Sequence, residues 1–191
     1  MVTEPNSIQT LKEFYGDRLH VDDQATLHVE LMNGNDRSAI ITVAAICDSG
    51  LEARIAFELP GLKKASKKEV DDAFRHDGAL GSFSSRISLA FYMNLIDETT
   101  RKQLTDMRHI RNAVAHTKRR VTLADVQLQN AVLRLLHPTG MYKLLDDTPE
   151  GFLRSFIAEG ILLCTVIHLG RDEGIEKHRS TFTEAGIPAP F

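Results

Sequence analysis

The amino-acid sequence predicts an all-α protein, a bundle of helices packed around one core. Apolar residues recur at helical spacings of three and four along most of the chain. One such stripe, at steps of four, three, four and four, comprises Ile40, Ala44, Cys47, Leu51 and Ile55. Two helix-start signals are strong: the capping box of Ser66 and Glu69, and the cap Thr148 followed by Pro149. Alternating strand patterns with hairpin turns are missing from the sequence, which therefore favours a helical bundle.

The N-terminal half of the sequence predicts four helices. Their expected bounds are residues 7–18, 22–32, 36–57 and 66–76. Asn33-Gly34 stops the second helix, and Asp36 is placed to cap the third. Pro60-Gly61 ends the third helix, because proline cannot continue a helix that precedes it. A run of small residues at 78–85 then predicts a loop.

The C-terminal half predicts four more helices. Their expected bounds are residues 86–95, 98–116, 123–136 and 149–169. Asp97 caps the second of these helices and Thr122 caps the third, which Pro138 and Gly140 close. After Gly170 the chain becomes charged and loses clear periodicity. We therefore expect one helical domain over residues 1–170 and a polar tail over 171–191.

The charge of the chain argues against tight, non-specific binding to nucleic acid. The 191 residues carry a net charge of −3, whereas nucleic-acid-binding domains usually have a strong basic excess. The basic cluster that stands out is Lys118-Arg119-Arg120. It is either a solvated helix end that complements the helix dipole or a rim that attracts phosphate.

The two cysteines and the apolar stretches predict a cytoplasmic protein that does not use a membrane. Cys47 and Cys164 lie in apolar helical runs and have no partner at a CxxC or zinc spacing, so we expect two buried thiols in a reducing compartment. The N-terminus is polar and lacks the apolar core of a signal peptide. The most apolar stretch, residues 161–169, is too short to cross a bilayer.

A polar stripe interrupts the helix expected at 98–116. His109, Asn112 and His116 are spaced by three and four residues, so they share one face of that helix. Arg111 lies beside the stripe, at the edge of the apolar face that Met107 and Val114 continue. The spacing therefore predicts one polar stripe with Arg111 close to Asn112 and His116.

This set of residue types suits phosphodiester chemistry without a metal. His116 would move a proton to or from a ribose oxygen, and Arg111 would stabilise charge on the phosphoryl oxygens. Asn112 would orient one of these groups or the substrate. A structural interpretation remains open beside this one. In it Asn112 and His116 hydrogen-bond neighbouring helices, and Arg111 pairs with an acid such as Asp48 or Glu52.

Other kinds of site receive less support from the sequence. The loop Gly81-Ser82-Phe83-Ser84 precedes a helix and would bind an anion through its N–H groups, or it is a tight, capped connection between helices. His109 and His116 are about 10 Å apart along a helix, too far to bind one metal ion. We therefore expect no metal and no other cofactor.

Two segments together resemble the mannitol operon repressor family of bacterial transcription regulators. One runs from Asn35 to Asp48, and the other contains GSFSSRISLA at 81–90 and RHIRNAVAH at 108–116. The resemblance covers residues 33–120 and, more loosely, 149–169. The pattern of Arg111, Asn112 and His116 also resembles the signature of HEPN domains, in which Arg and His are separated by four to six residues.

The resemblance implies an all-α, HEPN-like fold, a homodimer, and regulation through contacts with another protein, such as a transcription factor, without a DNA-binding motif. The alternative that it implies is a metal-independent, toxin-like ribonuclease. There Arg111 and His116 of two protomers, with Asn112 beside them, would line a shared cleft for RNA. In that alternative the surrounding basic rim would comprise Arg108, Lys118, Arg119 and Arg120. The polar tail after Gly170 departs from the pattern of the repressor family.

Overall fold

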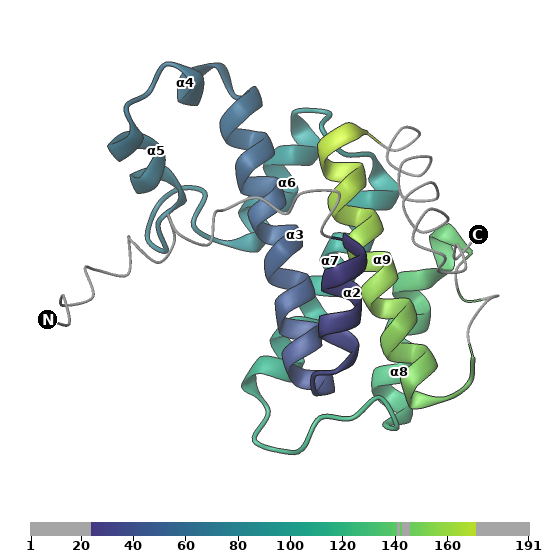
Figure 1. The fold of residues 1–191 in the computed structure, drawn as a ribbon. Helices are drawn as coiled ribbons and strands as arrows, with labels where there is room; N and C mark the ends of the chain where they lie inside the picture. The colour runs from purple at the N-terminus through teal and green to yellow at the C-terminus, as the bar shows by residue number, and fades with distance from the viewer. Residues whose placement is uncertain (1–23, 141, 143–145, 171–191) are drawn as a thin grey trace, which may run out of the picture.

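The computed structural model describes residues 24–140, 142 and 146–170, and these form helices without any strand (Figure 1). The all-α helical bundle that the sequence predicts is therefore confirmed. The helices are α2 (Gln24–Met32), α3 (Asp36–Glu58), α4 (Pro60–Lys63), α5 (Lys67–Phe74), α6 (Phe83–Tyr92), α7 (Glu98–His116), α8 (Val126–Leu136), the 3-10 helix η2 (His137–Thr139) and α9 (Pro149–Leu169). The helix expected at 7–18 and the tail at 171–191 lie outside the described residues.

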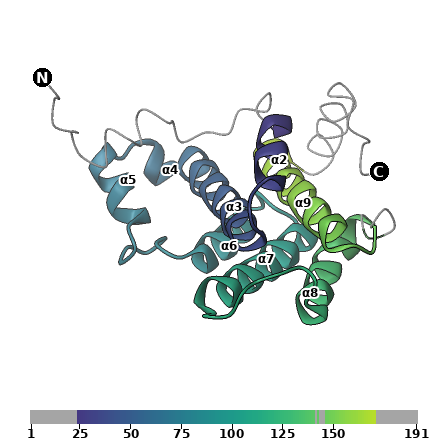
Figure 2. The same cartoon turned by 60° about the horizontal axis from the view of Figure 1, so that its bottom comes forward.

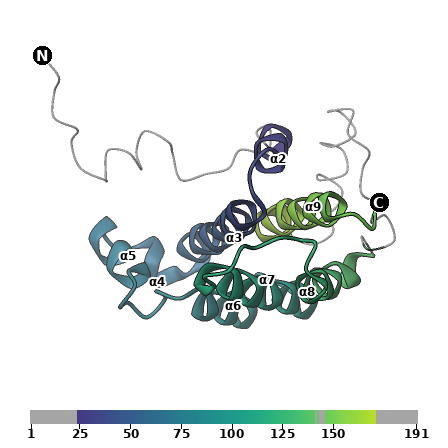
Figure 3. The same ribbon diagram turned by 90° about the horizontal axis from the view of Figure 1, so that it is seen from below.

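The helices pack in layers. Figure 3 shows α3 and α9 side by side in one layer and α6, α7 and α8 in a second layer beneath them. Helix α2 covers the opposite side of the first layer and lies along α9 (Figure 2). Helices α4 and α5 extend away from the end of α3 as a separate arm. In this arrangement α7 is central in its layer, with α6 on one side, α8 on the other and α3 above it.

The core lies between the two layers. The apolar stripe of α3 is confirmed, because all five of its residues are completely buried. Helix α9 is buried almost all round, over residues 151–153 and 156–167. Helices α3 and α9 approach closely at Gly160, where the Cys47 thiol donates a hydrogen bond to the Gly160 carbonyl over 3.3 Å. A Cβ atom at Gly160 would lie only 2.0 Å from Cγ1 of Val43, so the crossing requires glycine at this position.

Helix α9 is also long and apolar enough to span a membrane by length and composition. The sequence interpretation judged the stretch at 161–169 too short to cross a bilayer and noted that the longer helix contains Arg154, Glu159 and His168. In the fold, 78% of the most apolar window of α9 is buried, as expected for a helix covered on all sides by neighbours. Its buried acid, Glu159, accepts hydrogen bonds from Gln103 Nε2 at 2.6 Å and from Thr139 Oγ1 at 2.8 Å. These bonds join α9 to α7 and to η2.

Most of the expected helix caps are confirmed. The capping box of Ser66 and Glu69 forms at the start of α5, Asp97 accepts the Thr100 N–H at the start of α7, and Thr148 accepts the Gly151 N–H at the start of α9. Such local caps depend only on residues within one turn of each other, which explains why the sequence reveals them.

Two predicted helix caps, Asp36 for α3 and Thr122 for α8, are wrong because tertiary contacts intervene. The cap of α3 is Asn35, whose side chain accepts the Ser38 N–H. Asp36 instead accepts the N–H of Leu123 over 2.7 Å. Leu123 is completely buried, and this anchoring holds its segment out of the helix, so that α8 begins at Val126 instead of residue 123. Pro60 also does more than end α3, because it begins the short helix α4.

Burial makes both cysteines poor nucleophiles. Desolvation raises the pKa of the Cys164 thiol to about 11 and raises the pKa of Cys47 well above its usual value. Because the thiolate is the reactive form, we expect neither thiol of the native protein to react with a disulfide reagent at pH 8. Both should react after unfolding in urea, as counted by the absorbance of the released thiol. Rapid labelling of one cysteine in the native protein would contradict this burial.

Candidate functional site

The candidate site is built on α7. Its inner face is buried in the core at Leu104, Met107, Ile110 and Val114, and it packs towards α3. The stripe predicted from the sequence lies on the other side, where His109 and His116 are exposed and Asn112 is half-buried. The helical spacing therefore places these three side chains on the face that α3 does not cover.

Asn112 and His116 do not form the hydrogen bonds to neighbouring described helices that the structural interpretation assigned to them. Among the described residues, the side chain of neither one forms a hydrogen bond or an ion pair. In the part of the chain that the structure describes, the His109 ring has one hydrogen-bond partner, its neighbour Arg108, whose Nη2 lies 3.2 Å from the His109 Nε2. The stripe is thus accessible, and its polar groups are available to a ligand.

Arg111 does not pair with Asp48 or Glu52, the acids that the structural interpretation proposed for it. Both carboxylates form ion pairs with Arg86 of α6, whose guanidinium lies 2.7 Å from Asp48 and 3.1 Å from Glu52. The half-buried Arg111 lies instead against α6, with its guanidinium carbon 6.0 Å from the centre of the Phe83 ring. No carboxylate among the described residues forms an ion pair with Arg111. Its charge is therefore held in place by packing without being neutralised.

The N-terminus of α3 holds the end of α7 and the loop that follows it. The Arg37 guanidinium donates hydrogen bonds to the carbonyls of Val114 and Thr117, each over 3.0 Å, and to the carbonyl of Arg119. The Asp36 carboxylate holds Leu123 at the other end of the loop. The basic cluster at 118–120 is therefore carried on a loop that is attached to the core at both ends.

Positive charge gathers along α7 and this loop. Residues 98–125, which make up α7 and this loop, contain seven Lys or Arg residues and three acids, Glu98, Asp106 and Asp125, a balance of +4. The rest of the chain therefore carries −7, because the whole carries −3. The sequence interpretation named Arg108, Arg111 and the cluster at 118–120 but not Arg101 and Lys102, since it considered only the total charge of the chain. A count of charge along the chain would have revealed the asymmetry.

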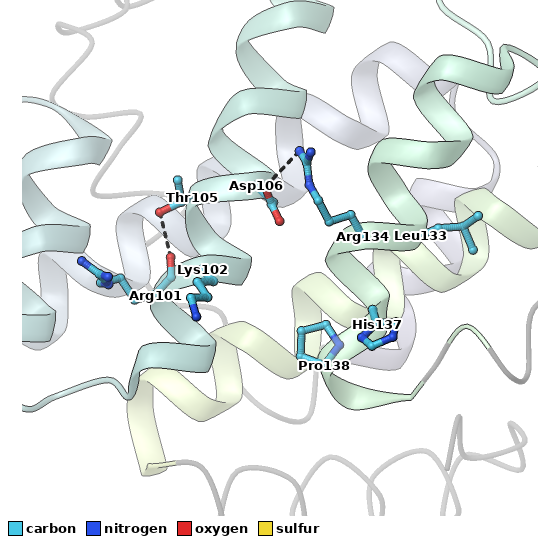
Figure 4. A pocket seen from close by; sticks show the side chains of 8 residues that line it. All are labelled: Arg101, Lys102, Thr105, Asp106, Leu133, Arg134, His137 and Pro138. Carbon is cyan, nitrogen blue, oxygen red and sulfur yellow. Dashed lines mark hydrogen bonds and ion pairs between the residues drawn. The ribbon is translucent and has the colours of Figure 1, made fainter.

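A groove lies between the N-terminal half of α7 and the end of α8. Its volume is about 690 Å³, and Figure 4 shows the side chains around it. The groove is lined by Arg101, Lys102, Thr105, Asp106, Leu133, Arg134, His137 and Pro138. Arg134 of α8 reaches across to Asp106 of α7, with 3.0 Å between Nη2 and Oδ1. The sequence interpretation did not find this groove, because it depends on how two helices meet.

Glu98, at the start of α7, pairs with two of the cations that line the groove, Arg101 and Lys102. Arg101 donates a hydrogen bond to Glu98 over 2.8 Å, and this bond, with the nearby charge of Lys102, lowers the pKa of the Glu98 carboxyl. Arg101 also lies 4.4 Å from the centre of the Phe91 ring. Glu98 therefore stays ionised and partly offsets two of the cations on α7.

The small-residue loop before α6 is a capped connection between helices. Ser82 accepts the Ser85 N–H over 3.0 Å, and the Ser85 hydroxyl lies 2.8 Å from the Ser82 hydroxyl. A Cβ atom at Gly81 would lie 2.2 Å from the carbonyl oxygen of Arg75, so this connection requires a glycine. These bonds satisfy the N–H groups that an anion would use, which favours the structural interpretation of the loop.

Across the part of the chain that the structure describes, no group of three His, Cys, Asp or Glu side chains could hold a metal ion. Arg111, Asn112 and His116 line neither the α7–α8 groove nor the smaller hollow beside Asn94. Their convergence at an interface between two copies stays a prediction. The sequence matches no family model and no curated protein, and the fold matches no solved structure.

Proposed function

We propose that this protein is a cytoplasmic transcription regulator of the mannitol operon repressor type, which acts by binding another protein. The observation that supports this proposal is the concentration of positive charge on α7 and its loop, against a strongly acidic remainder. Such a patch attracts and orients an acidic partner. The partner therefore presents a surface rich in Asp and Glu, such as one found on a transcription factor.

The attachment of the basic loop at 118–120 to the core supports binding to a protein partner. Arg37 and Asp36 hold the loop at 118–120 against the core, so little conformational entropy is lost when a partner binds it. The three cations of the loop are exposed, whereas the chain as a whole repels polyanions through its net charge of −3. A regulator that binds an acidic protein needs a local basic patch of this kind and no excess of positive charge elsewhere.

A second candidate function is a metal-independent ribonuclease that works as a homodimer. The observation in its favour is that Arg111 has no acidic partner among the described residues and that His116 is exposed. An unneutralised guanidinium and an accessible imidazole are the groups that cleavage of an RNA phosphodiester uses. None of the described residues hydrogen-bonds to the His116 ring to orient it, so we expect catalysis to require the second copy.

One experiment separates the two candidates. The chromosomal gene is replaced by alleles that encode the wild-type protein, Lys118→Glu/Arg119→Glu/Arg120→Glu, or His116→Ala, and transcript levels and RNA 5′ ends are both sequenced. We expect the wild-type protein to change the levels of a small set of transcripts without new internal RNA ends. The triple variant should weaken this effect by about tenfold, since charge reversal repels an acidic partner.

The matched control is Lys64→Glu/Lys67→Glu/Lys68→Glu, which makes the same change of charge on exposed lysines of the α4–α5 arm. It should regulate like the wild-type protein. Equal loss in both triple variants, or no change of any transcript by the wild-type protein, would refute the proposal. Widespread internal RNA ends that disappear in His116→Ala would establish the ribonuclease instead, and the purified dimer should then cleave RNA in EDTA.

A further inference from the structure

We infer that the α7–α8 groove and the His109–His116 stripe form one continuous docking track, and that its occupant is an acidic amphipathic helix of the partner protein. This inference rests on the proposed function, in which the protein acts through protein contacts. It adds the surface that receives the partner and the kind of segment that the partner inserts.

The groove and the stripe are continuous along α7. Lys102 and Thr105, which line the groove, precede His109, Asn112 and His116 at steps of three, four, three and four residues. Residues at these steps lie on one face of a helix. From Lys102 to His116 this face is about 21 Å long, at a rise of about 1.5 Å per residue. That length accommodates about four turns of a partner helix.

The walls of the groove suit a helix with an apolar stripe. Leu133 and Pro138 contribute apolar surface from α8 and η2, and the aliphatic stems of Arg101 and Lys102 contribute it from α7. The groove's volume of about 690 Å³ leaves room for the aliphatic side chains that a helix presents at positions i, i+3 and i+4.

The rim of the track selects for negative charge. Lys102 and Arg134 are well exposed, with 70% and 63% of their side chains accessible, although Lys102 also lies 3.5 Å from Glu98, and His137 is exposed beside them. The acid that lines the groove, Asp106, is 22% exposed and already paired with Arg134. Glutamate or aspartate residues that flank the apolar stripe of a partner helix would therefore meet cations on both sides of the groove.

The same track is poorly suited to single-stranded RNA. Its exposed face on α7 carries Lys102, Thr105, His109, Asn112, Ala113 and His116, with no Phe, Tyr or Trp on which a base could stack. At the end of the groove the His137 ring is already stacked on Tyr142, with 5.2 Å between the ring centres. Because the α7 face of the track offers no aromatic ring to a base, the track favours a protein helix over a nucleic acid.

The test measures binding of labelled peptides to the full-length protein by fluorescence anisotropy. The probe is a helical peptide of about 16 residues with a leucine stripe flanked by glutamates, about the length of the track. A second peptide has the same composition in scrambled order, and a third has lysine in place of glutamate. A fluorescent single-stranded RNA of similar length is the fourth ligand.

We expect the acidic amphipathic peptide to bind at least about tenfold more tightly than the scrambled and lysine peptides. The variant Lys102→Glu/Arg134→Gln should weaken this binding by at least about tenfold, because it reverses the charge of the rim. Lys64→Glu, on the distant arm, should leave binding unchanged. Circular dichroism of each variant checks that the helices are intact.

Equal binding of the ordered and scrambled peptides would overturn the inference, because attraction would then be a matter of charge alone. Tighter binding of RNA than of the peptide in physiological salt, or no binding of the peptide, would also overturn it. The proposed function has a separate readout. Suppose that Lys102→Glu/Arg134→Gln regulates transcripts normally while Lys118→Glu/Arg119→Glu/Arg120→Glu does not. The docking track would then be refuted, and the proposed regulatory function would be retained.

Discussion

Replacing Arg86 by methionine should destabilise the protein by about 3 kcal/mol, the cost of removing one partner from a buried ion pair. This is a large share of the total stability of a domain, which is typically about 5–15 kcal/mol. The side chain of Arg86 is only 9% exposed, and it joins the acids of α3 to the segment between α5 and α6.

The reason lies in the number of groups that Arg86 satisfies. Besides its two carboxylates on α3, it donates hydrogen bonds to the Leu80 carbonyl over 2.9 Å and to the Phe74 carbonyl over 3.1 Å. Methionine fills a similar volume but donates nothing. The two carbonyls and the Asp48 carboxylate, which is 20% exposed, would then lack their donor.

The measurement is unfolding in urea, followed by circular dichroism, for the wild-type protein and the variant. The matched control is Arg75→Met, which also breaks ion pairs but on the surface. Arg75 bonds to Asp72 and Asp77, yet its side chain is 62% exposed, so its loss should cost far less stability than the loss of Arg86. Similar costs for the two variants would show that burial does not distinguish these arginines.

The second large effect is expected at Gly160. Gly160→Ala should destabilise the protein by about 2–3 kcal/mol, although alanine is the better helix former by about 1 kcal/mol. The added Cβ would lie 2.0 Å from Cγ1 of Val43, and valine is too stiff at χ1 to move aside within a packed helix interface. Helices α3 and α9 would have to separate, which would loosen the layer against which α7 packs.

A double-mutant cycle tests this explanation. Val43→Ala removes the atom that the new methyl group would meet, so Gly160→Ala should cost almost nothing in the Val43→Ala background. Gly61→Ala in α4 is the control, since no other atom lies within 4 Å of the added Cβ there. Additive effects of Gly160→Ala and Val43→Ala would rule out the close contact as the cause.

The features of the fold that the sequence reveals are those that act within a few residues. The stripe from Ile40 to Ile55 and the caps Ser66, Asp97 and Thr148 follow from helical spacing and local hydrogen bonds. The start of α8 was misplaced for the opposite reason. The bond from Leu123 to Asp36 joins residues 87 positions apart, and no local pattern indicates it.

The candidate site divides in the same way. The sequence places His109, Asn112 and His116 on one face, because that depends only on the period of a helix. The sequence did not show which arginine forms ion pairs with Asp48 and Glu52, the acids of α3. Arg86 and Arg111 both follow apolar spacing in helices beside α3, and only the packing of α6 and α7 against α3 assigns Asp48 and Glu52 to Arg86.

For this protein the sequence alone determined the helical class, most helix ends and the polar stripe of α7, because periodicity and capping are properties of neighbouring residues. The tertiary structure decided that Arg111 has no acidic partner among the described residues, that Arg37 attaches the basic loop to the core, and that a groove lies between α7 and α8. These features arise where distant segments meet, and their contacts depend on how whole helices pack together.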